Sequence, residues 1–277
     1  MRRVAHLSDL HFGRIEPGVL EELRRRLINL QPNLVVVSGD LTQRAKPREF
    51  RGARAWLDTL PWPRVVVPGN HDVPLYNILR RFFRPLAAYQ RFISPDLQPS
   101  YIDEEIAVVG VNTARSLVFK GGRINQAQVA AVREAICRLD PSLTKIVVTH
   151  HPFDVPAGPG ADRQIVGRGR MALQRLAECG ADVLLAGHLH ASHIGHTQQR
   201  YDIAGLSALV IQAGTATSRR TRHEPNAFNL LRITSRHIEV DQYVLQDEDF
   251  VPAATEAFDR KAGQWVRTQD RGRTVAG

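Results

Sequence analysis

The chain is patterned as short apolar runs separated by longer stretches with helical periodicity. The runs are rich in Val, Ile and Leu, and they lie at residues 4–7, 34–38, 65–68, 107–111, 146–149, 183–186, 209–212, 229–233 and 238–244. The amphipathic stretches lie near residues 17–30, 48–60, 75–92, 126–139 and 171–179. Strands that are apolar throughout are buried on both faces, and the intervening helices cover those faces. The pattern therefore predicts a layered α/β fold.

The last three strands, at 209–212, 229–233 and 238–244, follow one another with little helix between them. This spacing predicts an antiparallel meander that closes the core as part of a second sheet. We find no repeat and no obvious linker, so residues 1–250 are expected to form one domain. Residues 251–277 are expected to form a C-terminal extension, partly helical around Phe258 and Trp265 and then flexible from Arg271.

Of the 277 residues, 43% are hydrophobic and 23% are charged, which is ordinary for a globular domain. No apolar run approaches membrane-spanning length. His6, Asp9 and His11 interrupt the first apolar stretch, so we expect no export signal and a cytoplasmic protein. The two cysteines, Cys137 and Cys179, fall within predicted helices. We expect them to be buried free thiols in a reducing cytoplasm rather than a disulfide.

The positive charge of the chain comes almost entirely from arginine. The formal net charge is +9 and the isoelectric point is about 10.2, with only four lysines present. Such a balance favours polyanionic or phosphate-bearing partners. A solvated basic surface has the same composition, so charge alone does not identify the partner.

Five of the predicted strands run directly into a polar cluster. The clusters are Ser8-Asp9-Leu10-His11, Gly39-Asp40, Gly69-Asn70-His71-Asp72, His150-His151-Pro152 and Gly187-His188-Leu189-His190. In open α/β sheets, ligands bind at the carboxyl edge of the strands. We therefore expect all five clusters to meet in one cleft.

The side chains of these clusters suit metal binding. The candidate ligands are Asp9, His11, Asp40, Asn70, His150, His188 and His190. A mixed set of oxygen and nitrogen ligands favours manganese, iron or zinc over magnesium or calcium. Seven ligands are too many for one tetrahedral ion and predict two divalent ions, with Asp40 as the carboxylate that they share. His71 is expected to face the substrate and to stabilise the transition state or protonate the leaving oxygen.

Taken in this order, the five clusters resemble the signature of the calcineurin-like metallophosphoesterase superfamily over about residues 3–245. The resemblance implies a two-sheet α/β sandwich with four αββα layers, and a catalytic domain over residues 1–250. It implies that one ion takes Asp9, His11, Asp40 and His190, and that the other takes Asp40, Asn70, His150 and His188. It also makes His71 the catalytic histidine that is not a ligand. His151 is then a supporting or substrate-facing residue, unless its role is structural.

Within the superfamily, the sequence is most similar to bacterial class III cyclic nucleotide phosphodiesterases. Residues 110–125, 214–219 and 226–229 carry this similarity. Two positions depart from the pattern. Gln43 stands where the family often has an Asp that supports the catalytic histidine, and an amide cannot stabilise an imidazolium as an anion would. Phe153 stands where the cyclic nucleotide enzymes often have a second proline.

These features predict a metal-dependent phosphoric diester hydrolase. Its substrate is expected to be a small phosphodiester such as a cyclic nucleotide or a glycerophosphodiester, attacked by a hydroxide held between the two ions. The candidate substrate residues are Asn112, Arg115, His151 and Arg219. Three alternatives stay open: a nuclease acting on single-stranded DNA or RNA, a nucleotide-lipid pyrophosphatase, and an inactive metal-dependent regulatory protein. The sequence is compatible with a homodimer and does not determine the native metal.

Overall fold

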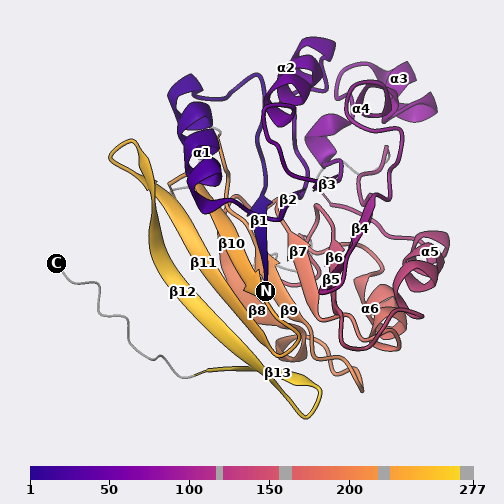
Figure 1. Cartoon of the computed structure of the whole chain (residues 1–277). Helices are drawn as coiled ribbons and strands as arrows, with labels where there is room; N and C mark the ends of the chain where they lie inside the picture. The colour runs from indigo at the N-terminus through magenta and orange to yellow at the C-terminus, as the bar shows by residue number, and fades with distance from the viewer. Residues whose placement is uncertain (117–120, 156–163, 218–224, 269–277) are drawn as a thin grey trace.

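Two mixed β-sheets form the centre of the molecule (Figure 1). The computed structural model describes residues 1–116, 121–155, 164–217 and 225–268. The first sheet has the order β13-β12-β11-β10-β1-β2-β3, and the second has the order β4-β5-β6-β7-β9-β8. The strands of the first sheet are β1 (Arg2–Leu7), β2 (Leu34–Val37), β3 (Arg64–Val66), β10 (Ala227–Ile233), β11 (His237–Gln246), β12 (Asp249–Lys261) and β13 (Gln264–Arg267). Those of the second are β4 (Ser100–Ile102), β5 (Ile106–Gly110), β6 (Thr144–Val148), β7 (Val183–Ala186), β8 (His193–His196) and β9 (Leu209–Gln212).

Helices cover the outer face of each sheet. Leu34 and Val36 of β2 point into the core between the sheets, whereas Val35 and Val37 point the other way, as strand geometry requires. That outer face packs against α1 (Pro17–Leu30), α2 (Pro47–Leu57) and α4 (Ala87–Phe92). The outer face of the second sheet packs against α5 (Gln126–Ile136) and α6 (Gly169–Ala177). The structure thus has the four layers of the predicted two-sheet α/β sandwich.

The helices follow the amphipathic stretches closely, with one exception. The expected helix at 75–92 is two short helices, α3 (Ile78–Phe83) and α4. Pro85 lies between them and disfavours helical backbone at Arg84, which has φ −146°. None of the helices that the structure describes is long and apolar enough to cross a membrane.

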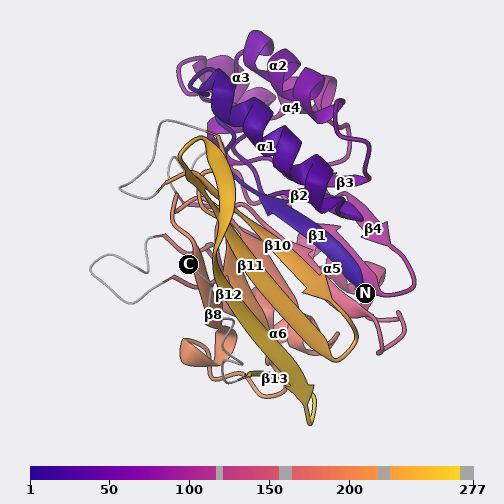
Figure 2. The same ribbon diagram turned by 60° about the vertical axis from the view of Figure 1, so that its left-hand side comes forward.

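The C-terminal segment differs from its expectation. The predicted helix around Phe258 and Trp265 is wrong, because both residues lie on the strands β12 and β13. The two strands form a hairpin whose turn, at Ala262 and Gly263, has positive φ at both positions. Figure 2 shows β11 and β12 as long neighbouring strands that run down the front of the molecule. Residue 250 lies inside β12, and the expected flexible tail from Arg271 lies outside the described residues.

The predicted meander is only partly correct. Strand β9 runs parallel to β7 in the second sheet, so it is not part of the meander. Strands β10, β11, β12 and β13 are the antiparallel series, and β10 joins it to β1. Apolar runs do not show which sheet a strand joins, because β9 and β10 both bury residues between the sheets. The short strands β4 and β8 were not expected, since neither is a continuous apolar run.

The prediction of free thiols is wrong. Cys137 caps the C-terminal end of α5, Cys179 follows the end of α6, and the two form a disulfide with their Cα atoms 4.3 Å apart. The helices pack together on the same face of the second sheet. That packing brings together two cysteines that are 42 residues apart in the sequence.

We expect the disulfide to stabilise the folded chain, because it restricts a loop of this length in the unfolded state. Reduction should lower the free energy of unfolding by about 4 kcal/mol in the chain-entropy description. Urea unfolding with and without a reductant measures the difference, and the variant Cys137→Ser/Cys179→Ser should show no response to reductant. Two free thiols per chain in protein kept without reductant would contradict this expectation.

Candidate metal centre

The seven predicted ligands follow five parallel strands at one end of the two sheets. Asp9 and His11 follow β1, Asp40 follows β2 and Asn70 follows β3, all from the first sheet. The second sheet supplies the other three, His150 after β6 and the pair His188 and His190 after β7. The ligands therefore come from both sheets and meet where the carboxyl ends of the strands adjoin.

Asp9 lies between two histidines. Its Oδ1 atom is 3.4 Å from His11 Nε2 and 3.6 Å from His190 Nε2. The rings of His11 and His190 are stacked, with centroids 5.1 Å apart and planes 5° apart. Ligand atoms of these three residues all lie within 4.8 Å of one another, close enough to share one ion.

Asp40 joins this group to a second one. Its Oδ2 atom is 3.4 Å from His150 Nε2 and 3.8 Å from His11 Nε2. Asn70 Oδ1 lies 3.0 Å from His150 Nε2 and 3.1 Å from His188 Nδ1. One carboxylate oxygen of Asp40 thus stands between the two groups, which is the position that a shared carboxylate requires.

The backbone at these positions is strained. Five of the seven residues have positive φ, including 55° at Asp9 and 52° at Asp40; the others are His11, His188 and His190. Such conformations cost about 1–3 kcal/mol each and persist where the surrounding structure enforces them. They are typical of functional sites, where a strand must turn sharply to aim a side chain.

Glycine is required before three of the ligands because other atoms pass too close. A Cβ at Gly69 would overlap the carboxylate of Asp40, and a Cβ at Gly187 would overlap the hydroxyl of Ser8. At Gly39, where φ is 95°, a Cβ would lie 2.6 Å from His150 Nδ1. The contacts at Gly39 and Gly187 join loops of the two sheets, and the contact at Gly69 joins two loops of the first sheet, all without room for a side chain.

Hydrogen bonds hold the imidazoles in place. His150 Nδ1 donates to the carbonyl of Ser38 at 2.8 Å, so its Nε2 atom faces Asp40 with its lone pair when the ring is neutral. His190 Nδ1 is 2.6 Å from the hydroxyl of Thr215. Histidines that bind metals are commonly oriented in this way through the other ring nitrogen.

Asp72 is a structural residue to which the sequence analysis assigned no role. Its carboxylate accepts hydrogen bonds from the backbone of Gly69 at 2.9 Å, of Leu41 at 3.2 Å and of Thr42 at 2.9 Å, and from the Thr42 hydroxyl at 2.8 Å. It therefore ties the loop after β2 to the loop after β3. Burial, together with the nearby Asp40, raises the pKa of Asp72 to about 6. The position of Asp72 directly after Asn70-His71 is the sequence feature from which a role at this site could have been predicted.

His71 is anchored by the carboxylate of Asp40 and by a backbone carbonyl. Its amide donates to Asp40 Oδ1 at 2.8 Å, and its Nδ1 atom is 3.0 Å from the main-chain carbonyl of Gln43. The amide side chain of Gln43 supplies neither contact. Gln43 stands where the family often has Asp, but the group that contacts the His71 ring is the backbone carbonyl of this residue. Every residue type has that carbonyl, so the replacement of Asp by Gln does not remove this contact.

The carboxylates and imidazoles of the centre shift one another's pKa values. Burial raises the pKa of Asp40, but His150 and other nearby imidazoles hold it well below its ordinary range, and the pKa of Asp9 is also lowered, chiefly by His190 against the effect of burial. Burial lowers the pKa of His150, yet Asp40 and Asp9 raise it to about 9. Burial lowers the pKa of His188 to about 3. Two buried carboxylates therefore stay ionised, and bound cations would stabilise them.

The four predicted substrate residues do not lie together. Asn112 and Arg115 line a cavity of ≈ 560 Å³, with Phe83 and Leu97. The side chain of Arg115 donates to the carbonyls of Asn112 and Ala114 at 3.3 Å and 3.0 Å. No predicted metal ligand lines this cavity among the described residues. Arg219 lies outside the described residues.

His151 is buried at the metal centre instead. Its Nδ1 atom is 2.8 Å from the hydroxyl of Thr113, and its Nε2 atom has no hydrogen-bond partner among the described residues. Ring nitrogens of His150, His151 and His188 lie within 4.8 Å of one another. His151 thus contacts the ligands rather than the cavity that holds Asn112 and Arg115.

Comparison with known proteins agrees with this geometry. Residues 2–192 match the sequence profile of the calcineurin-like phosphoesterase family. The chain belongs to that family. The buried His and Asp groups could hold metal ions, and a site of this composition is typical of the family.

Two curated relatives match part of the chain. Glycerophosphodiester phosphodiesterase GpdQ of Enterobacter lignolyticus is 36% identical over 85 residues, which are 25% of this chain and 29% of that protein. A probable cyclic nucleotide phosphodiesterase of Synechococcus is 31% identical over 81 residues, 26% of this chain and 31% of that protein. The matched segments thus span less than a third of each relative.

Solved structures share the fold. Purple acid phosphatase PPD1 from yellow lupin superposes with a TM-score of 0.70 at 13% identity, over 92% of this chain and 53% of that one. The structure of PhoD gives a TM-score of 0.69 at 11% identity, over 99% of this chain and 72% of that one. Both confirm the two-sheet metallophosphoesterase fold. Because the sequence identities are this low, the two structures support the fold and carry no information about the substrate.

Gly187→Ala should weaken metal binding without unfolding the chain, because the new Cβ would overlap Ser8 and lie 2.7 Å from Asp9 Oδ2. The loop after β7 must then shift, and we expect the affinity for manganese to fall about 10–100-fold. Calorimetric titration of metal-free protein measures it. Gly18→Ala is the control, since a Cβ at Gly18 meets nothing within 4 Å. Equal manganese affinity in both variants would show that the close approach at Gly187 is not needed.

Proposed function

We propose that the protein is a phosphodiesterase of small phosphodiesters that uses two divalent ions. The observation that carries the proposal is the position of Asp40 Oδ2, between His150 Nε2 at 3.4 Å and His11 Nε2 at 3.8 Å. A single carboxylate oxygen between two sets of ligand atoms suits two adjacent ions that share a bridge.

The donor set fits divalent ions with mixed preferences. Two buried carboxylates, one amide oxygen and four imidazoles suit manganese, iron or zinc better than magnesium or calcium. One ion would take Asp9, His11, Asp40 and His190. The other would take Asp40, Asn70, His150 and His188. Bound there, the ions would activate water as a nucleophile near neutral pH and neutralise charge on the phosphoryl oxygens.

His71 is the residue of this chain that would handle the leaving group. Its amide is held by Asp40 and its ring by the Gln43 carbonyl, so the imidazole is positioned beside the centre without being one of the seven ligands. Its ring centroid is 4.9 Å from that of His11. An imidazole at this place can donate a hydrogen bond or a proton to the departing oxygen.

Two observations favour a small diester. The named activities of both curated relatives are phosphodiester hydrolysis. The cavity of ≈ 560 Å³ has the size of a small-molecule site, and Asn112 and Arg115 line it. We infer that these two residues contact the part of the substrate that is not transferred.

His71→Ala should keep the metal and lose rate. Removing a general acid typically costs about 10²–10⁴-fold in turnover, while the seven ligands remain. Turnover of bis(p-nitrophenyl) phosphate with manganese, together with metal content, measures both effects. Gln43→Ala keeps the carbonyl that holds His71 and should lose less than about tenfold. If His71→Ala lost both ions along with turnover, its assigned role would be wrong.

A substrate panel on manganese-loaded protein tests the substrate class. We expect hydrolysis of glycerophosphodiesters or cyclic nucleotides to exceed hydrolysis of phosphomonoesters, and Asp40→Ala should remove nearly all turnover because no shared carboxylate remains. Single-stranded DNA cleavage that falls steeply with salt would instead indicate a nuclease. An absence of turnover on every substrate, with both ions bound, would favour a regulatory protein.

A further inference from the structure

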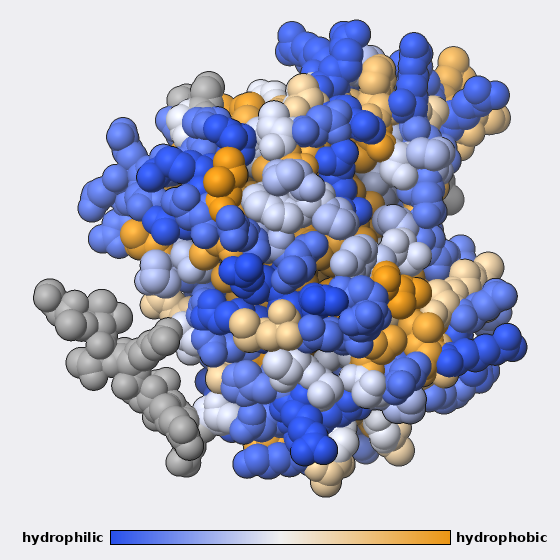
Figure 3. Space-filling model, viewed as in Figure 1, coloured by the Kyte–Doolittle hydropathy of each residue, from blue (hydrophilic) through white to orange (hydrophobic). Residues whose placement is uncertain are grey.

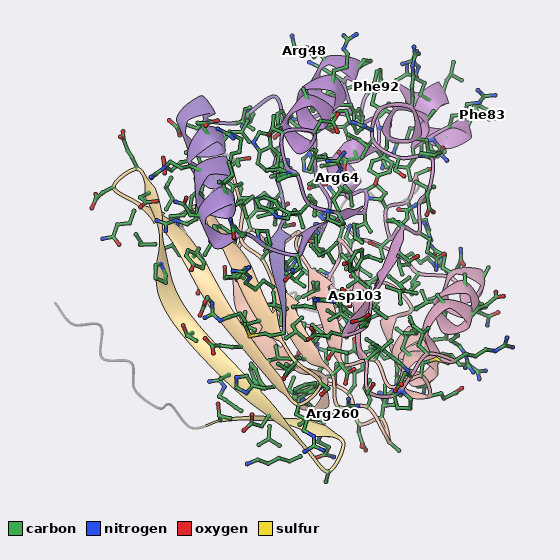
Figure 4. All side chains as sticks on the ribbon, viewed as in Figure 1. Arg48, Arg64, Phe83, Phe92, Asp103 and Arg260 are labelled. Carbon is green, nitrogen blue, oxygen red and sulfur yellow. A yellow bond between two sulfur atoms is a disulfide. The ribbon has the colours of Figure 1, made fainter. Side chains whose placement is uncertain are left out.

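Helix α3 and Tyr76, two residues before it, carry their apolar side chains on the outside. Tyr76, Ile78, Leu79, Phe82 and Phe83 are between 49% and 80% exposed, and they are five of the nine large hydrophobic residues exposed on the described chain. Figure 4 shows Phe83 at the outer edge of the molecule, pointing away from the sheets. We call these five residues the α3 face. Exposed apolar groups that cluster in this way mark an interaction site, whereas single ones do not.

Of the two arginines on the same helix, Arg80 is exposed and the other points inward. Arg81 is buried, and its guanidinium donates to the carbonyl of Ser116 at 2.7 Å and to that of Pro74 at 3.0 Å. A helix on a water-covered surface has the reverse arrangement, with cations outside and apolar groups inside. The hydrogen bonds of Arg81 fix α3 with its apolar side outward.

The segment of sequence that contains the α3 face is strongly cationic. Between residues 43 and 95 the chain has ten Lys and Arg residues and three Asp and Glu residues, which accounts for most of the net charge of +9. None of the three acidic residues lies between 73 and 95, where Arg80, Arg84 and Arg91 are exposed. Figure 3 shows apolar and strongly polar side chains interleaved at the upper right, where Figure 1 places α3.

We propose that the α3 face docks this protein on an anionic phospholipid surface. Apolar and aromatic side chains on one face of a short helix, flanked by arginines, suit insertion at the boundary of headgroups and acyl chains. The arginines would pair with lipid phosphates. A second copy of the chain is a poorer occupant, because a two-fold contact through α3 would bring two cationic regions together.

Sedimentation with vesicles of phosphatidylglycerol and phosphatidylcholine tests the proposal on the full chain. Wild-type protein should bind these vesicles at low salt and should bind pure phosphatidylcholine vesicles far less. Ile78→Ser/Leu79→Ser should weaken binding at least about tenfold, because two inserted side chains are lost. Arg80→Gln/Arg91→Gln should weaken it about fivefold per residue and reduce its dependence on salt.

The control removes the same number of exposed apolar side chains elsewhere. Ile102→Ser/Val266→Ser, on β4 and β13, should bind vesicles as wild type does. Turnover of bis(p-nitrophenyl) phosphate should be unchanged in all these variants, which shows that they fold and separates this proposal from the enzymatic one. Absence of wild-type binding, or equal losses in the Ile78/Leu79 and Ile102/Val266 variants, would overturn the proposal. The proposal would also be overturned if light scattering showed that the wild-type protein is a dimer in the absence of vesicles and that Ile78→Ser/Leu79→Ser dissociates this dimer.

Discussion

The burial of Asp9 and Asp40 between the two sheets is the constraint on which the rest of the site depends. Two ionised carboxylates without water are costly unless positive charge lies beside them. Imidazoles from both sheets surround them, and His150 Nε2 lies 3.4 Å from Asp40 Oδ2. The ligands of one sheet alone do not complete the site, because the remaining ligands belong to the other sheet. The candidate metal centre therefore forms only when the two sheets pack together.

Close contacts between loops maintain this arrangement. The amide of His188 donates to Asp9 Oδ2 at 3.0 Å, and His150 Nδ1 donates to Ser38, so each sheet holds a ligand loop of the other. Gly187 lets the loop after β7 lie against Ser8. These contacts maintain the strained positive φ angles at the ligands. Within the first sheet, Asp72 joins the loop after β2 to the loop after β3.

The α3 face adjoins the cavity that Asn112 and Arg115 line and contains none of the seven predicted ligands. Phe83 belongs to the face and also lines the cavity that contains Asn112 and Arg115. Arg81 connects the two regions, because its guanidinium bonds Ser116, which lines the same cavity. The surface proposed to bind lipid and the cavity proposed to hold part of the substrate therefore share one segment of chain.

Local patterns in the sequence determined most of the strands and helices and the choice of the seven candidate ligands, because continuous apolar runs and the polar clusters after them are visible within a few residues. Tertiary structure alone decided the rest. The disulfide between Cys137 and Cys179, the hairpin of β12 and β13, the placement of β9, the outward apolar side of α3 and the Gln43 carbonyl on His71 each depend on partners far away in the sequence. The energy of such contacts comes from packing and hydrogen bonds between distant segments, and periodicity along the chain does not encode which segments meet.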